Sequence, residues 1–205
     1  YTPQPIQGLR SNDTVSSCFE KRNQLSFMRS QSLGVKTNQT LVVKFPGHTE
    51  GLNTKLEAMK KTIARLPLVY QVTFSGAVPG EEVATFLSNR RTNDALKQNR
   101  LYEMLACDPD YVDAYGLQVV AGRNFSEDYG DDVDKLVINE TAVRNLGFTS
   151  NDEAIGELVN VECTDAPMQI IGVVKDYHQQ ALSKNYTPIM LIHKDKIAWL
   201  PQRYI

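Results

Sequence analysis

Residues 168–178 read MQIIGVVKDYH, the clearest strand in the second half of the chain. A short apolar run rich in β-branched residues and ending at a polar segment is typical of a buried strand, which we expect over residues 168–174. Gly172 lies inside this run, where a glycine marks a kink or the close approach of another backbone. The polar residues 175–178 are then the exit of the strand from its sheet.

Asp176 and His178 follow this strand two residues apart and are a candidate acid–base pair, because histidine titrates near neutral pH. The alternative is that a polar loop simply begins there. The other histidines, His48 and His193, complete no Ser–His–Asp order, and the chain has neither a glycine-rich phosphate loop nor a G-x-S-x-G elbow. We therefore expect no catalytic residue and no cofactor, and we interpret Asp176 and His178 as a loop that orients parts of the protein or contacts a partner.

The composition is that of a globular protein. The chain has 205 residues, 41% of them hydrophobic and 22% charged, with a net charge of -2. These values argue against a disordered or fibrous chain, and the absence of a basic stripe argues against nucleic-acid binding. No run approaches the roughly 18 apolar residues of a membrane span, and the sequence starts without a signal peptide. We expect either a cytosolic protein or a mature or excised segment of a larger one.

No metal site is expected from the cysteines. Cys18, Cys107 and Cys163 are far apart in the sequence and lack the C-x-x-C spacing of zinc sites. Their odd number suits buried thiols, or one disulfide and a spare thiol, and does not identify the redox compartment.

The segment 121–134 holds two further candidates. Its acidic residues suggest a calcium loop, but they lack EF-hand spacing, so we favour a solvated loop. Arg123, in a turn after a strand, could bind an anion, but we favour pairing with a nearby acid. The acidic residues are Glu127, Asp128, Asp131, Asp132 and Asp134.

The first half predicts a strand, a helix and a second strand. Residues 40–45 and 68–74 are β-rich, and the segment between them has apolar residues at helical spacing. Together they predict a βαβ or split βαβ unit whose helix covers one face of a sheet. A helix is also expected over residues 17–33, ended by Gly34. The apolar stripe of the middle helix is Leu52, Leu56, Met59, Ile63 and Leu66.

Capping residues predict two more helices. Asp108, with Pro109 behind it, is expected to cap a short helix that ends at Gly116. Asn139 ends a strand and is expected to cap a helix that Gly147 terminates. The segment 151–156 predicts another short helix or turn, and residues 157–163 and 188–193 predict strands. Residues 83–99 are ambiguous between strand and helix.

Several phrases in the same order resemble one family. LSFMRSQSLGVKTNQTLVVKF, DPDYVDAYGLQVVAGRNFSEDYG, LVINETAVRNLGF, AIGELV and IIGVVKDYHQQAL are similar to the MacB-like periplasmic core domain of FtsX-like ABC transporter permeases, over roughly residues 24–192. No single motif is diagnostic, but the ordered series is specific. The resemblance implies an α+β fold of two lobes, a βαβ-containing porter-like subdomain and a smaller β-rich subdomain.

The expected domain boundaries follow from this fold. Residues 1–34 form a lead-in and stalk-proximal helix, 35–130 the porter-like lobe, 131–193 the β-rich lobe, and 194–205 a segment returning toward the membrane.

The resemblance also implies a function. Such domains lie on the periplasmic side of the bacterial inner membrane between transmembrane helices, and they relay ATP-driven movement or engage substrates without catalysis. The expected partners are a second permease copy, a cytoplasmic ATP-binding subunit and, as a further candidate, a periplasmic adaptor protein. Two alternatives stay open: a periplasmic hydrolase using Asp176 and His178, and a stand-alone ligand-binding module.

Overall fold

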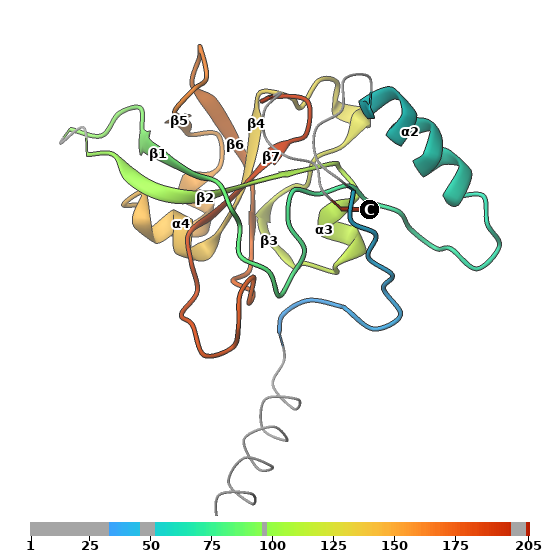
Figure 1. The fold of residues 1–205 in the computed structure, drawn as a ribbon. Coiled ribbons are helices and arrows are strands. Elements are labelled where there is room, and N and C mark those ends of the chain that lie inside the picture. The colour runs from blue at the N-terminus through green and yellow to red at the C-terminus, as the bar shows by residue number, and fades with distance from the viewer. Residues whose placement is uncertain (1–32, 46–51, 96–97, 198–203) are drawn as a thin grey trace, which may run out of the picture. The chain divides into compact units, whose positions relative to one another are not determined.

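The computed structural model describes residues 33–45, 52–95, 98–197 and 204–205 (Figure 1). They belong to one compact unit, Leu33–Ile205, separate from Tyr1–Ser32. The helix expected over residues 17–33 lies almost wholly outside the described residues. In chain order the elements are α2 (Leu52–Ile63), β1 (Phe86–Arg91), β2 (Arg100–Cys107), α3 (Tyr111–Ala114), β3 (Val119–Gly122), the 3-10 turn η1 (Glu127–Tyr129), β4 (Lys135–Asn139), α4 (Glu140–Asn145), α5 (Asn151–Ala154), β5 (Leu158–Asn160), β6 (Met168–Val174) and β7 (Ile189–His193).

All strands of the described region join one sheet, in the order β3-β6-β4-β7-β2-β1-β5, and a further β5–β6 pairing closes it on itself. The β2–β7 and β4–β6 pairs are parallel, and the others are antiparallel. Strands from both sides of residue 130 therefore share hydrogen bonds. The protein is a mixed α/β fold built on this sheet.

The strand predicted over residues 168–174 is confirmed as β6, which pairs with three other strands. Its amino-terminal end pairs with β5 and its carboxyl-terminal end with β3, both along one edge, while β4 occupies the other edge. The predicted close approach at Gly172 is confirmed, because a Cβ there would collide with the carbonyl oxygen of Arg123. Only glycine lets the turn after β3 lie against β6.

Each face of the sheet packs its own apolar cluster. Because side chains alternate along a strand, Met104 and Ala106 of β2 join one cluster, while Leu105 and Cys107 join the other. Helix α4 covers the first face, and α3 contributes Tyr111 to the second.

The two β-rich segments of the expected βαβ unit do not form strands, and this prediction was wrong. Residues 40–45 and 68–74 are irregular, and β-bridges occur only at Lys44 and Ser75. Both residues bridge to Tyr204, so the segments flank the carboxyl-terminal residues and do not pair with each other. Strand propensity depends on a partner strand, and among the described residues these segments form only isolated bridges, through Lys44 and Ser75. The helix between them is present as α2 but ends at Ile63, before Leu66.

Of the two predicted helix caps, one is wrong and the other is confirmed. Asp108 does not cap α3, which begins after Asp110; the Asp108 side chain is buried and binds other groups, described below. Gly116 has a φ of 59°, the left-handed conformation expected after a helix. Asn139 caps α4 as predicted, since its side chain accepts a hydrogen bond from the Ala142 amide, and Gly147 follows with a φ of 83°.

The ambiguous segment 83–99 contains β1, which forms an antiparallel pair with β2. The predicted strands near residues 157–163 and 188–193 are confirmed as the shorter β5 and β7, and the segment at residue 151 as helix α5.

Candidate functional site

A ladder of single β-bridges joins residues near both ends of the described unit to strand β2. Lys44 bridges Tyr204, Tyr204 bridges Ser75, and Ser75 bridges Cys107 at the end of β2. The Ser75 amide donates to the Tyr204 carbonyl at 3.0 Å, and the Tyr204 amide donates back at 3.0 Å. We call these four residues the bridge ladder.

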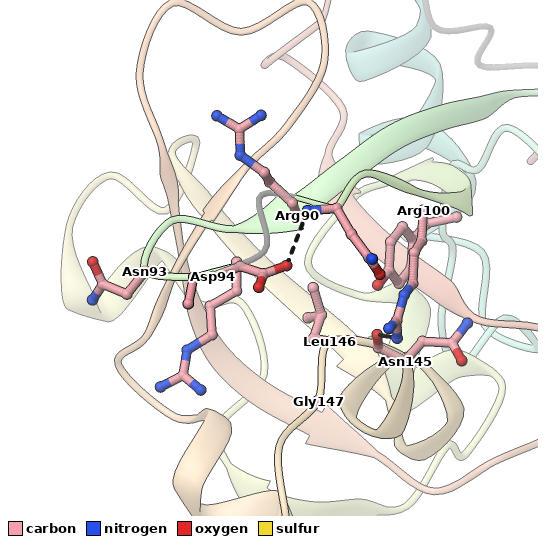
Figure 2. A pocket seen from close by; sticks show the side chains of 11 residues that line it. Arg90, Asn93, Asp94, Arg100, Asn145, Leu146 and Gly147 are labelled. Carbon is pink, nitrogen blue, oxygen red and sulfur yellow. Dashed lines mark hydrogen bonds between the residues drawn. The ribbon is translucent and has the colours of Figure 1, made fainter.

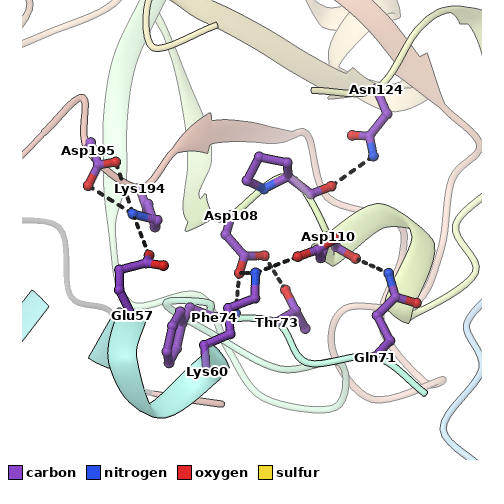
Figure 3. A network of polar contacts seen from close by, with 11 residues as sticks. Glu57, Lys60, Gln71, Thr73, Phe74, Asp108, Asp110, Asn124, Lys194 and Asp195 are labelled. Atoms are coloured by element: carbon purple, nitrogen blue, oxygen red, sulfur yellow. Dashed lines mark hydrogen bonds and ion pairs between the residues drawn. The ribbon is translucent and has the colours of Figure 1, made fainter. Parts of the chain in front are cut away.

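Asp108, next to the ladder, ties α2 and the ladder to the end of β2 (Figure 3). Its buried carboxylate accepts hydrogen bonds from the Phe74 amide at 3.0 Å and from the Lys60 ammonium at 2.6 Å. It also accepts one from the Thr73 hydroxyl. Lys60 binds Asp110 as well. Burial lowers the pKa of Lys60, but its hydrogen bonds to the two carboxylates outweigh burial and raise that pKa above its ordinary value.

A second lysine contacts α2 about one turn before Lys60 (Figure 3). Lys194, just after β7, contacts Glu57 of α2 at 3.0 Å and Asp195 at 2.9 Å. Burial lowers the pKa of Lys194, and the hydrogen bonds to Asp195 and Glu57 raise it by more. Leu56 is the one α2 side chain that the structure describes as buried. Within the described side chains of α2, the buried Leu56, the half-buried Met59 and Ile63 and two ion-pair clusters attach the helix.

Asp176 and His178 do not form the acid–base pair considered above. Asp176 accepts hydrogen bonds from the Thr141 amide at 2.8 Å and from Arg144 at 2.7 Å, which anchors the first turn of α4. The His178 ring lies against Tyr186 instead, with the ring centroids 4.6 Å apart. His178 lines a shallow, open groove with Arg144 and Lys184.

Arg123 pairs with a nearby acid, as predicted. Its two terminal nitrogens donate to the two carboxylate oxygens of Asp132 at 2.7 and 2.8 Å, and its guanidinium lies over the Tyr129 ring. This pairing, more than the Ser126 amide, lowers the pKa of Asp132. In the part of the chain that the structure describes, no group of three or more metal-ligating side chains comes together, the acidic loop included.

A polar pocket of about 300 Å³ lies between the β1–β2 hairpin and the end of α4 (Figure 2). Arg100 projects toward α4 and donates to the carbonyl of Asn145. Arg91, also in the lining, is committed to Glu157 at 3.0 Å. Tyr102 forms part of the wall, and its burial raises its pKa to about 12. The arginines thus mainly stabilise the fold.

One buried carboxyl was not foreseen from the sequence. Glu103 of β2 is 2% exposed, and one of its oxygens accepts a hydrogen bond from the Gln180 side chain at 2.9 Å. Burial raises the pKa of Glu103. A charged residue inside a strand gives no sequence signal that it faces inward.

The cysteines within the described residues are free thiols, Cys107 buried and Cys163 exposed. Cys18 lies outside the described residues. Over the described ranges, no helix is long and apolar enough to cross a membrane.

The comparisons with known proteins point to one family. The sequence pattern described as "MacB-like periplasmic core domain" matches residues 19–204. Among proteins with curated functions, none matches the chain.

Solved structures include similar folds. The extracellular domain of the noncanonic ABC-type transporter YknZ from Gram-positive bacteria has a TM-score of 0.52 and 18% identity, covering 80% of this chain and 78% of its own. The periplasmic region of MacB from Actinobacillus actinomycetemcomitans has a TM-score of 0.49 and 19% identity, covering 83% of this chain and 71% of its own.

Proposed function

Because the chain belongs to the MacB-like periplasmic core domain family, we propose that it is the extracytoplasmic domain of an ABC transporter permease and relays movement without catalysing a reaction. ATP-driven rearrangement in the membrane would displace the flanking chain on both sides of the domain. The domain would pass this displacement to a substrate or partner on the periplasmic side of the inner membrane.

The bridge ladder is the observation that carries this proposal. Residues 43–44 and 204–205 are hydrogen-bonded to each other, and through Ser75 they reach the end of β2. A displacement applied near both ends of the unit would therefore move the central strands together. Rigid-body movement of this kind is a common way to transmit a conformational change.

The proposed partners follow from the family. They are a second permease copy, a cytoplasmic ATP-binding subunit that acts through the membrane region and, as a further candidate, a periplasmic adaptor protein. The two-lobe division, with parts at 35–130 and 131–193, stays a prediction, as does the return of residues 194–205 toward the membrane. Since both parts contribute strands to one sheet, we propose that they move as one body.

Neither alternative gains support. A hydrolase using Asp176 and His178 requires the two side chains to share a proton, whereas Asp176 binds Thr141 and Arg144 and His178 lies against Tyr186. A stand-alone binding module predicts a lined cleft between two lobes, whereas strands from both parts of the chain share one sheet.

The test uses the full-length permease with its ATP-binding subunit in membrane vesicles. Ser75→Pro removes the amide that binds Tyr204, so we expect ATP hydrolysis to continue while transport falls at least tenfold. The matched control, His178→Gln, leaves the bridge ladder intact and should transport normally. Loss of transport in the control with normal transport in Ser75→Pro would contradict the proposal.

A further inference from the structure

Two segments expose an unusual number of large apolar side chains next to the bridge ladder. Six of the twelve exposed large apolar side chains in the described residues come from 41–43 and 66–70. We call this set the apolar edge: Leu41, Val42, Val43, Leu66, Leu68 and Tyr70. It borders a groove of about 460 Å³ that Ile63, Tyr115 and Ile205 also line.

Side chains of the apolar edge project outward into solvent. Leu68 is 87% exposed and Tyr70 is 99% exposed, in the loop that follows α2 on the side of the unit away from β1 and β5 (Figure 1). Pro67 lies between the exposed leucines of this loop. A protein partner would need pockets shaped for these side chains, whereas a fluid lipid interface surrounds protruding leucine and tyrosine side chains without prior fit.

Basic residues flank these segments in the sequence. Arg65 comes directly before Leu66, and Lys61 lies about one turn earlier, in α2. Lys36, whose amide donates to the Tyr115 carbonyl, precedes the segment 41–43. Among the described residues, none of the three side chains takes part in an ion pair. The nearby carboxylate of Asp110 is already bound by Lys60. Cations without ion pairs, close in sequence to the protruding leucine and tyrosine, complement an anionic lipid surface.

We propose that the apolar edge and its flanking cations dock on an anionic membrane surface, with Leu68 and Tyr70 entering the headgroup region. This inference rests on the proposed function, under which the chain after Ile205 leads to the membrane and Ile205 lines the same groove. Docking would give the relay a resting position against the bilayer.

The test is co-sedimentation of the 205-residue chain with vesicles of phosphatidylglycerol and phosphatidylethanolamine, and with vesicles of phosphatidylcholine alone. We expect binding to the anionic vesicles that falls at least fivefold in Leu68→Ser combined with Tyr70→Ser, and that weakens with salt in the wild type. Lys61→Gln combined with Arg65→Gln should also weaken it. The matched control is Leu101→Ser, which removes a side chain that is 64% exposed elsewhere on the unit.

Three outcomes would overturn the inference. They are no vesicle binding, equal binding of the Leu68→Ser and Tyr70→Ser double variant, and concentration-dependent self-association in analytical ultracentrifugation that the double variant abolishes. The last outcome would assign the apolar edge to a second copy of the chain. None of these three outcomes contradicts the relay proposal. That proposal is tested separately, by measuring ATP hydrolysis and transport in Ser75→Pro.

Discussion

The carboxylate of Asp108 receives the ammonium of Lys60 at 2.6 Å while it also accepts the Phe74 amide at 3.0 Å, so one buried side chain joins α2, the segment before Ser75 and the end of β2. The Asp108 side chain is 1% exposed. A buried carboxylate is tolerated only when its oxygens are well paired, and here the amide, a hydroxyl and an ammonium supply that pairing.

Removal of this carboxylate should destabilise the unit strongly. Asp108→Ala leaves the Phe74 amide and the Lys60 ammonium without their buried acceptor, and we expect the free energy of unfolding to fall by about 3 kcal/mol. Urea denaturation measures it. The control Asp113→Ala, at an exposed position of α3, should change stability by less than about 0.5 kcal/mol. Equal effects of the two substitutions would show that the Asp108 carboxylate does not stabilise the unit in this way.

The charge on Glu103 should make the unit less stable at neutral pH. Since burial raises its folded pKa above the unfolded value, the folded state holds this proton more tightly, and stability is lost as pH rises from the unfolded pKa through the folded one. Glu103→Gln removes this penalty, so the variant should exceed the wild type in free energy of unfolding at pH 7. The difference should vanish below the ordinary glutamate pKa of about 4.3.

Thermal unfolding at a series of pH values from 3.5 to 8 measures this difference. Glu82→Gln is the control, because Glu82 is exposed and its hydrogen bond to Lys184 lowers its pKa, so this substitution should give no gain at pH 7. A pH-independent difference for Glu103→Gln would contradict the prediction.

Two glycines with positive φ should respond differently to alanine. At Gly122, with a φ of 68°, a Cβ would collide with the carbonyl oxygen of Ile171, whereas at Gly147, with a φ of 83°, it would meet open space. Gly147→Ala should therefore cost only the left-handed strain of about 1 kcal/mol. Gly122→Ala adds the clash between β3 and β6, and we expect about 3 kcal/mol in total. Chemical denaturation of both variants measures the difference, and similar losses would contradict it.

Local signals in the sequence predicted the part of the fold around β6 well. The apolar run at residues 168–174, the cap at Asn139 and the close approach at Gly172 each depend on neighbours in sequence or on one backbone contact. The βαβ unit failed because its two β-rich segments meet Tyr204, about 130 residues further along the chain than Ser75. No local pattern encodes that pairing.

The candidate site was harder to predict than the fold. The sequence placed Asp108 at a helix start, because an Asp-Pro pair before an apolar segment is typical of a cap, whereas burial and the distant Lys60 decide its role. In the sequence, Lys60 is only a basic residue near the end of a predicted helix, where a positive charge is favourable. Its pairing across 48 residues is a tertiary contact that becomes visible only in the folded chain. For Arg123 the partner was nine residues away, and there the prediction was confirmed.

The hydrogen-bonded pair Val43 and Ile205, next to the bridge ladder, can be locked chemically. The Val43 amide donates to the Ile205 carbonyl at 2.8 Å and the Ile205 amide donates back at 3.1 Å, so the two residues lie directly opposite each other in an antiparallel pair. Their Cα atoms should then be about 5.5 Å apart, which lies within the range of disulfides. In a Cys163→Ser background, Val43→Cys combined with Ile205→Cys should form a disulfide on mild oxidation, measured by thiol titration and mass spectrometry. Val42→Cys combined with Ile205→Cys should not, because successive side chains point to opposite faces. If the bridge ladder moves as a unit, the permease with this disulfide should still transport. If the disulfide stops transport while ATP hydrolysis continues, the Val43–Ile205 pair must open during transport.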